Sequence, residues 1–204
     1  MKDYVSIDLE TTGFSADKDD IIEIGAWKVK QGVVVDKFTT LVRPIAYIPR
    51  TIQQLTGITM EDVKDCETIE PNIIEFYDFC EDLPFLGHNL SFDFNFLQAK
   101  GKAVGLDFSL KRRRCGIDTL KLSKKYLNLE NNKLETVASH FNIQLDAERG
   151  GYHRAGYDAY ITKLIYDRFA LLYPKCEGVS IPELIALDNK NYGKVVNNET
   201  LSFI

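Results

Sequence analysis

The sequence predicts an α/β fold in which helices flank a mixed, five-stranded sheet. Three apolar runs near the N-terminus are separated only by short polar segments, which is the pattern of an antiparallel meander. Further along, short apolar runs alternate with stretches of helical periodicity, as is typical of a sheet covered by helices. With 204 residues, of which 45% are hydrophobic, the chain is long enough to bury one well-formed core.

The five strands are short apolar runs bounded by turn signals. Gln31 and Gly32 form a turn between the second and third runs, so these two strands are expected to pair as a hairpin. Residues 104–107 are compatible with either a strand or a loop. Strands are predicted over residues 5–10, 21–30, 33–42, 84–87 and 115–119.

The helices follow from apolar residues at helical spacing and from capping residues. Gly57 is expected to end a short helix, Thr59 to cap the next, and Pro174 to stop the last. Ser91 is expected to be the N-cap of a helix in the middle of the chain. Helices are predicted over residues 51–56, from 60 onward, and over 68–80, 91–102, 120–126, 132–140 and 154–172.

The bulk composition argues against some classes of protein. The net charge is −5, so a nucleic-acid ligand would need a local basic patch or metal ions that mask the acids. Lys111 to Arg114 form the one basic cluster, which either grips a nucleic-acid backbone or is a solvated loop. No apolar run is long enough to span a membrane. The first residues lead directly into a strand, which leaves no room for a signal peptide. Four separated cysteines, without a C-x-x-C pair, are typical of reduced thiols in a cytoplasmic protein: Cys66, Cys80, Cys115 and Cys176.

The first strand ends in two carboxylates. Asp8 and Glu10 are one residue apart, so they project from the same face of the strand, about 7 Å apart. Two acids on one face of a buried strand are costly unless a positive group lies between them, and a divalent cation is the simplest such group. The alternative is a strand that ends in an exposed acidic turn.

A third acid lies at the start of a helix. With Ser91 as N-cap, Asp93 falls in the first helical turn, where the helix dipole favours the ionised carboxylate. The alternative is a surface acid that only stabilises the dipole. Nearby, His88 is either a functional residue or, as is more typical at a strand end, a structural histidine. Asp118 either orients loops or caps the helix that follows it, and the cap is favoured.

A fourth acid lies on the last helix. Ala155, Asp158, Thr162 and Ile165 recur at helical spacing, so Asp158 lies among core-facing positions. A lone carboxylate there is costly unless it is paired, which predicts either a metal ligand or a buried ion pair. His153 precedes this helix, and its ordinary pKa near 6.5 suits a general base at neutral pH. A surface histidine is the alternative.

Three motifs in order resemble those of one exonuclease family. They are the stretch from Asp8 to Gly13, the His88-Asn89 pair followed by Asp93, and His153 followed by Asp158. Together they resemble the DEDDh group of the DnaQ-like 3′–5′ exonucleases, which have an RNase H-like fold. The stretch Leu55-Thr56-Gly57-Ile58 is closest in wording to the exonuclease domain of PolC-type polymerases. It has Thr56 where the epsilon proofreading subunit of DNA polymerase III carries a histidine.

The resemblance implies an active site. Asp8, Glu10, Asp93 and Asp158 would hold two Mg²⁺ or Mn²⁺ ions that clamp the scissile phosphate. His153 would take the proton from the attacking water, which makes it and the four acids the catalytic set. Contacts to the terminal nucleotide are implied for Leu9, Thr11, Thr12, Ile58 and Asn89.

The implied activity is metal-dependent 3′–5′ hydrolysis of DNA to nucleoside 5′-monophosphates, in DNA polymerase III proofreading or in repair. The implied partners are single-stranded DNA or a DNA 3′ end and a DNA polymerase subunit. One alternative is an enzyme that trims RNA 3′ ends, like RNase T or oligoribonuclease; another is a non-catalytic module that binds nucleic acid or a polymerase. Residues 1–174 are predicted to form the exonuclease domain, with residues 175–204 as an extension that binds a partner or covers the domain.

Overall fold

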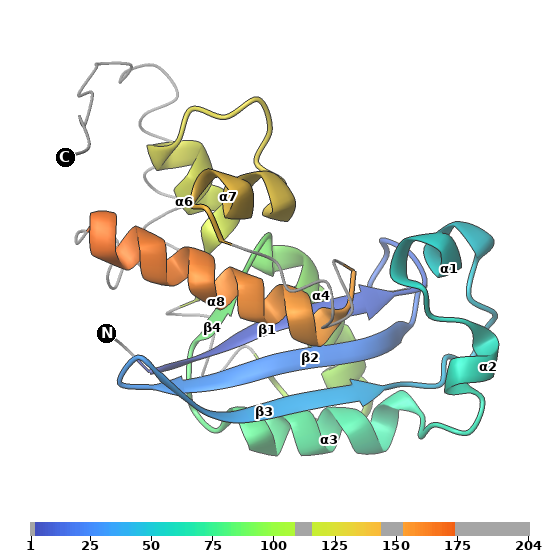
Figure 1. Cartoon of the computed structure of the whole chain (residues 1–204). Helices are drawn as coiled ribbons and strands as arrows, with labels where there is room; N and C mark the ends of the chain where they lie inside the picture. The colour runs from blue at the N-terminus through green and yellow to red at the C-terminus, as the bar shows by residue number, and fades with distance from the viewer. Residues whose placement is uncertain (1–2, 109–115, 144–152, 174–204) are drawn as a thin grey trace.

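The fold is a five-stranded sheet with helices on both faces (Figure 1). A computed structural model describes residues 3–108, 116–143 and 153–173. The strands lie in the order β3-β2-β1-β4-β5, so β1 is central. Their bounds are Tyr4–Thr11 (β1), Ile21–Lys30 (β2), Val33–Leu41 (β3), Phe85–Gly87 (β4) and Ile117–Asp118 (β5).

The sheet is mixed, as predicted. The first three strands pair antiparallel, and Asp8 lies opposite Gly25 while Glu10 lies opposite Glu23. The last two strands run parallel to β1. Strand β4 is so short that it pairs with β1 only as far as Ser6. Beyond Ser6, the edge of β1 on that side has backbone groups that must find other partners.

The helices divide between the two faces of the sheet. Helices α3 and α4 cover one face, and α8 lies across the other, with α6 and α7 beside it (Figure 1). Their bounds are Arg50–Thr56 (α1), Met60–Val63 (α2), Ile69–Cys80 (α3), Leu90–Ala103 (α4), Thr119–Tyr126 (α6), Leu134–His140 (α7) and Ala155–Leu172 (α8).

The alternation of β1 separates the core from the polar side chains. Ile7 and Leu9 point into the core under α3 and α4, which also contains Phe76 and Phe96. Full burial of each such side chain contributes about 1.5–3 kcal/mol. The residues between them, at positions 6, 8 and 10, therefore face α8. The hydroxyl of Ser6 donates to the carbonyl of Ala159 in α8, at 2.7 Å.

Two local predictions differ from the structure. Ser91 is not an N-cap: Asn89 takes that position in a left-handed conformation, with φ 70°, and Ser91 lies inside α4. Asparagine tolerates this conformation better than most residues, which explains the earlier start. Residues 104–107 form a turn and loop and no strand. Gly57 ends α1, with φ 72°, and Thr59 precedes α2 with its amide donating to Asp62, as predicted.

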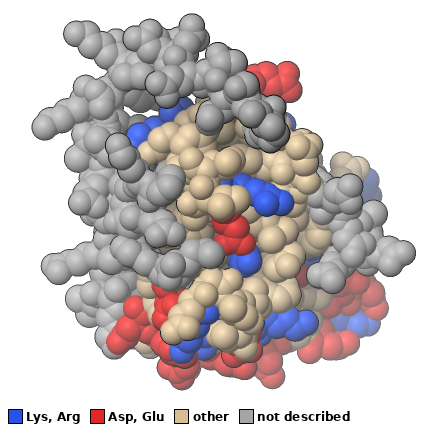
Figure 2. Space-filling view, turned by 60° about the vertical axis from the view of Figure 1, so that its left-hand side comes forward, with Lys and Arg blue, Asp and Glu red and all other residues tan. Residues whose placement is uncertain are grey.

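Several predictions lie outside the described residues. They are the basic cluster at 111–114, the cysteines at 115 and 176, and the extension at 175–204. Of the cysteines in the described residues, Cys66 is half-buried and Cys80 is buried. Among the described residues, no helix is both long enough and apolar enough to cross a membrane. Acidic side chains gather on the lower part of the face drawn in Figure 2, toward α3, and the described Lys and Arg residues there form no continuous patch.

Candidate active site

Two acids project from the central strand toward α8. Asp8 is half-buried and Glu10 is buried, and both side chains lie on the face of β1 that α8 covers. Gly25, opposite Asp8, lets α8 approach closely: a Cβ at this position would lie 2.1 Å from the carbonyl carbon of Ala155. The N-terminus of α8 is therefore pressed against the strands that carry these acids.

A third acid reaches β1 from α4. Asp93 lies in the first turn of α4, as predicted, and is only 3% exposed. Its Oδ1 accepts a hydrogen bond of 3.1 Å from the backbone N–H of Leu9. This donor lies on the stretch of β1 that β4 does not reach, so the short strand leaves room for the carboxylate.

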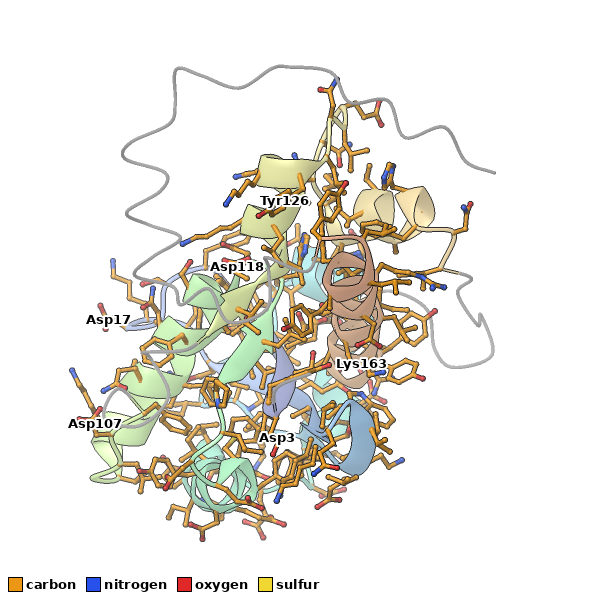
Figure 3. The ribbon with its side chains drawn as sticks, turned by 90° about the vertical axis from the view of Figure 1, so that its left-hand side faces the viewer. Asp3, Asp17, Asp107, Asp118, Tyr126 and Lys163 are labelled. Atoms are coloured by element: carbon orange, nitrogen blue, oxygen red, sulfur yellow. The ribbon has the colours of Figure 1, made fainter. Side chains whose placement is uncertain are left out.

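The loop before α4 is fixed by Asp118. Oδ1 of this side chain accepts from the amides of Asn89 and Leu120, each at 3.0 Å, so Asp118 both caps α6 and holds the loop before Asp93 (Figure 3). His88 contacts the hydroxyl of Thr119 and the carbonyl of Asn132 through its two ring nitrogens. Burial lowers the pKa of His88. The predicted cap by Asp118 is thus confirmed, and both ring nitrogens of His88 have the partners expected of a structural histidine.

The fourth acid and the predicted base meet at the start of α8. The backbone N–H of His153 donates to Oδ2 of Asp158 at 3.0 Å. His153 has φ 65°, a left-handed conformation that is uncommon for residues other than glycine. Its ring Nε2 lies 3.9 Å from Oε1 of Glu135 in α7. The ring is half-exposed, so the predicted base remains open to solvent.

Asp158 occupies the core-facing stripe that the sequence predicts. It is 6% exposed, and among the described residues it forms no ion pair. Its Oδ1 is buried and has no hydrogen-bond partner within the described structure. Among the described side chains, Asp158 is therefore not part of the buried ion pair that was the alternative to a metal ligand. Its Oδ1 is left without a partner there.

The four acids repel one another, and their burial raises their pKa values. Burial is the main cause in every case, and repulsion between the acids adds to it for Asp8 and Glu10. The pKa of Glu10 rises to about 8 and that of Asp158 to about 7. Burial also raises the pKa of Asp93, although hydrogen bonds from its own backbone N–H and from that of Leu9 lower it in part.

These residues fit a divalent cation. Within the described part of the chain, no Lys or Arg forms an ion pair with any of the four acids. Ligand atoms of Glu10, His153 and Asp158 lie within 4.8 Å of one another. Carboxylate oxygens are the preferred ligands of hard divalent cations, and such a cation would relieve the repulsion described above.

Most of the predicted nucleotide contacts have buried side chains. Ile58 packs in a small cluster with Ile22 and Ile48, and Leu9 belongs to the main core. The Thr12 hydroxyl accepts from the amide of Asp20, while that of Thr11 donates to Gly13. Any contact from these positions would therefore come mainly from backbone atoms. Asn89 is exposed.

Two features of the site were missed from the sequence. Glu23, in β2, is 1% exposed and is paired with Arg154, next to the predicted base. A glutamate inside an otherwise apolar strand was the available signal. Phe14 is 88% exposed, and its ring lies 6.5 Å from that of Phe92, the neighbour of Asp93. A large exposed aromatic residue beside a conspicuous motif was the signal there.

The chain is similar to one protein family and to PolC-type DNA polymerases. A family model described as "Exonuclease" matches residues 5–166. PolC-type DNA polymerase III of Thermotoga maritima is 37% identical over 182 residues, which cover 89% of this chain and 13% of that protein. PolC-type DNA polymerase III of Caldanaerobacter subterraneus is 39% identical over 165 residues, 80% of this chain and 11% of that protein. The chain thus spans about an eighth of the length of these relatives.

Solved structures share the fold. Exonuclease X in complex with 5′ overhanging duplex DNA matches with a TM-score of 0.66 and 24% identity, over 85% of this chain and 93% of that one. The nuclease domain of 3′hExo, a DEDDh family member bound to rAMP, matches with a TM-score of 0.70 and 19% identity, over 87% and 94% of the two chains. At these identities the likeness concerns the mixed sheet and its flanking helices, which confirms the predicted RNase H-like fold.

Proposed function

This chain belongs to the exonuclease family as a DnaQ-like 3′–5′ exonuclease domain, and from that premise we propose that DNA is its substrate. The product would be a nucleoside 5′-monophosphate, released from the 3′ end at each cycle. The family assignment alone fits both DNA and RNA as substrate. DNA is favoured because the PolC-type relatives are DNA polymerases.

One observation carries the proposed chemistry. The buried Oδ1 of Asp158 has no partner within the described residues, and it belongs to a group of four acids without a paired cation. A buried, unpaired carboxylate costs several kcal/mol unless a ligand supplies the missing charge. This cost supports metal binding by Asp8, Glu10, Asp93 and Asp158.

The proposed metal ions are two Mg²⁺ or Mn²⁺, which when bound neutralise the scissile phosphate and lower the pKa of the attacking water. The protein supplies their ligands from three elements that the fold brings together, β1, α4 and α8. Because these elements are packed against one another, the carboxylates are held in position before substrate arrives.

His153 would accept the proton of the attacking water. Its backbone N–H is held by Asp158, so the base and a metal ligand are fixed relative to each other. Its ring is half-exposed and shares a cluster of potential ligand atoms with Glu10 and Asp158. A proton taken up there can leave to solvent after each cycle.

The terminal nucleotide would lie against the loop after β1. Backbone groups of Leu9, Thr11, Thr12 and Ile58 are proposed to contact it, together with the exposed side chain of Asn89. Phe14 offers an exposed ring on which a base can stack, an interaction that tolerates any base.

A polymerase is the proposed partner. The PolC-type relatives are polymerases, and this chain resembles only about an eighth of each. We place the end of the exonuclease domain at residue 174, just after α8 ends at Leu172, and residues 175–204 in a separate extension. A role in proofreading or repair in the cytoplasm follows from these proposals.

The test is degradation of 5′-labelled single-stranded DNA and of the same sequence as RNA, with Mg²⁺, with Mn²⁺ and with EDTA. We expect a ladder that shortens from the 3′ end on DNA, absent with EDTA and lost in Asp8→Asn and His153→Gln. Asp167→Asn, in the C-terminal half of α8 and paired with Lys163, is the matched control and should leave the ladder unchanged. Faster degradation of RNA would assign the chain to RNA trimming. No cleavage of either polymer would favour a non-catalytic binding module.

A further inference from the structure

Glu23 is a buried carboxylate whose bonds all lead to the start of α8. Its Oε1 accepts from Nε and Nη2 of Arg154, at 3.2 and 2.9 Å. Its Oε2 accepts from the same Nε at 3.1 Å and from the backbone N–H of Ala155 at 2.9 Å. A planar guanidinium with two nitrogens on one carboxylate fixes orientation as well as distance.

The residues that Glu23 holds adjoin the predicted base. Arg154 is the extended residue before α8, and Ala155 is the first residue of the helix. The residue before them, His153, is in the left-handed conformation that directs its N–H to Asp158. This conformation carries a steric cost for histidine, so the surrounding contacts must hold it in place.

We propose that Glu23 is a positioning residue for the reaction: through Arg154 and the amide of Ala155, it fixes the turn that aims His153 and Asp158 at the metal site. The proposal rests on the proposed function, because it presumes that His153 is the base. Glu23 itself does not act on the substrate. It lies opposite Glu10 on the neighbouring strand, so the strand pair that carries one ligand also holds the turn that carries the base.

Two other hydrogen bonds between the sheet and α8 are made further along the helix. The indole Nε1 of Trp27 donates to the carbonyl of Gly156, and the hydroxyl of Ser6 to that of Ala159. Both bonds hold α8 itself, beyond its first residue. They would keep the helix on the sheet when Glu23 is altered, while the turn before the helix would be released.

The competing interpretation is that Glu23 and Arg154 form a buried ion pair that only stabilises the fold. The chain offers a matched control on the same strand. Lys28 in β2 is buried and pairs with Glu81 at 3.0 Å, beside Phe79 of α3 on the other face of the sheet. Loss of that pair should cost some stability and leave the reaction unchanged.

The kinetic test compares Glu23→Gln, Arg154→Met, Arg154→Lys and Glu81→Gln on single-stranded DNA. Glu23→Gln retains an oxygen for the Ala155 amide and loses the charge. We expect kcat to fall about 10- to 100-fold, as for other groups that orient catalytic ligands, with KM changed less than twofold. Arg154→Lys should retain part of the rate that Arg154→Met loses, and the double variant Glu23→Gln/Arg154→Met should lose no more than the worse single variant.

A spectroscopic readout tests the positioning without relying on activity. The chain has three histidines, so imidazole resonances are few and His153 can be assigned by its loss in His153→Gln. In Glu23→Gln the His153 resonance should shift or broaden, while those of His88 and His140 stay in place. Glu81→Gln should leave all three unchanged.

The outcomes separate this proposal from the proposed function. An unchanged kcat, or an unchanged His153 resonance in Glu23→Gln, overturns the positioning role. An equal rate loss in Glu81→Gln also overturns it, because the effect would then be one of general stability. If the wild type degrades neither DNA nor RNA, the proposed function fails, and a shifted His153 resonance would still establish the structural coupling. If Glu23→Gln does not fold, Arg154→Met decides by the same two measurements.

Discussion

Glu10 and Glu23 lie directly opposite each other on β1 and β2, yet among the described residues only Glu23 has a cation as partner. The paired glutamate holds a turn, and the unpaired one faces three other acids. The two opposing glutamates therefore differ in how their charge is balanced. This difference leads to predictions about pH, because an unpaired buried carboxylate holds its proton more tightly.

The metal-free protein should lose stability as the pH rises from about 5 to about 8. The pKa of Glu10 is raised from 4.5 to about 8, and that of Asp158 from 3.8 to about 7. An acid whose pKa is higher in the folded than in the unfolded protein stabilises the folded state at pH values below its unfolded pKa. This contribution is lost as the pH rises through its folded pKa. For a chain of this size, about 1 kcal/mol corresponds to about 2–4 °C in Tm, so a fall of several degrees is expected in EDTA.

Thermal melts with and without Mn²⁺ would measure this effect. Bound metal replaces the proton, so saturating Mn²⁺ should restore Tm at pH 8 and have little effect at pH 5. Glu10→Gln should flatten the pH dependence in EDTA. A Tm that depends on neither pH nor Mn²⁺ would contradict the proposal that the four acids bind metal together.

Asp158→Asn should weaken metal binding and stabilise the metal-free protein. The amide oxygen can still accept from the His153 N–H, whereas the negative charge and its repulsion are removed. Calorimetric titration with Mn²⁺ should show a loss of affinity of at least about 10-fold, and Tm in EDTA at pH 8 should rise. Asp167→Asn, nine positions along the same helix and paired with Lys163, should leave the Mn²⁺ affinity unchanged; an equal loss there would argue against a specific ligand role.

Gly25→Ala should disrupt the site through the backbone. Its Cβ would fall 2.1 Å from backbone atoms of Ala155 and Gly156, which cannot yield as a flexible side chain does. Overpacking of this kind costs about 1–3 kcal/mol, and displacement of the α8 N-terminus should abolish most activity. Gly156→Ala, whose Cβ would meet only the side chain of Thr39 at 3.0 Å, is the control and should fold and act nearly as the wild type. Urea melts would compare the stability of the two variants, and the DNA assay their activity. Equal losses in both variants would rule out the close contact between Gly25 and the backbone of α8 as the cause.

Phe14→Ala should weaken the binding of single strands without changing the fold. Stacking of a base on an aromatic ring is worth about 1–3 kcal/mol, so KM for a DNA oligonucleotide should rise about 5- to 150-fold. The ring is almost fully exposed, so Tm should not change. Leu171→Ala, also exposed but at the far end of α8, should alter neither quantity. Unchanged KM in Phe14→Ala would remove this residue from the binding surface.

Much of the fold and of the site could be predicted because the relevant signals are local. The alternation along β1 places Asp8 and Glu10 on one face, and helical spacing places Asp158 on a buried stripe. Asn89 was missed as a cap because its left-handed conformation depends on a hydrogen bond from its backbone N–H to Asp118, which belongs to a strand distant in the sequence. The pairing of Glu23 with Arg154 joins positions 131 residues apart, and no local pattern encodes such a contact.

The bond between Ser6 and Ala159 joins the first strand to the last described helix across 153 residues of sequence. Three of the four acids, Asp8, Glu10 and Asp93, are synthesised well before the fourth. A ribosome must therefore release α8 before the site can assemble, and contacts this far apart in the chain form slowly. A chain that ends before residue 153 would carry neither Asp158 nor His153, so under the proposed function it would have an incomplete site and should not hydrolyse DNA.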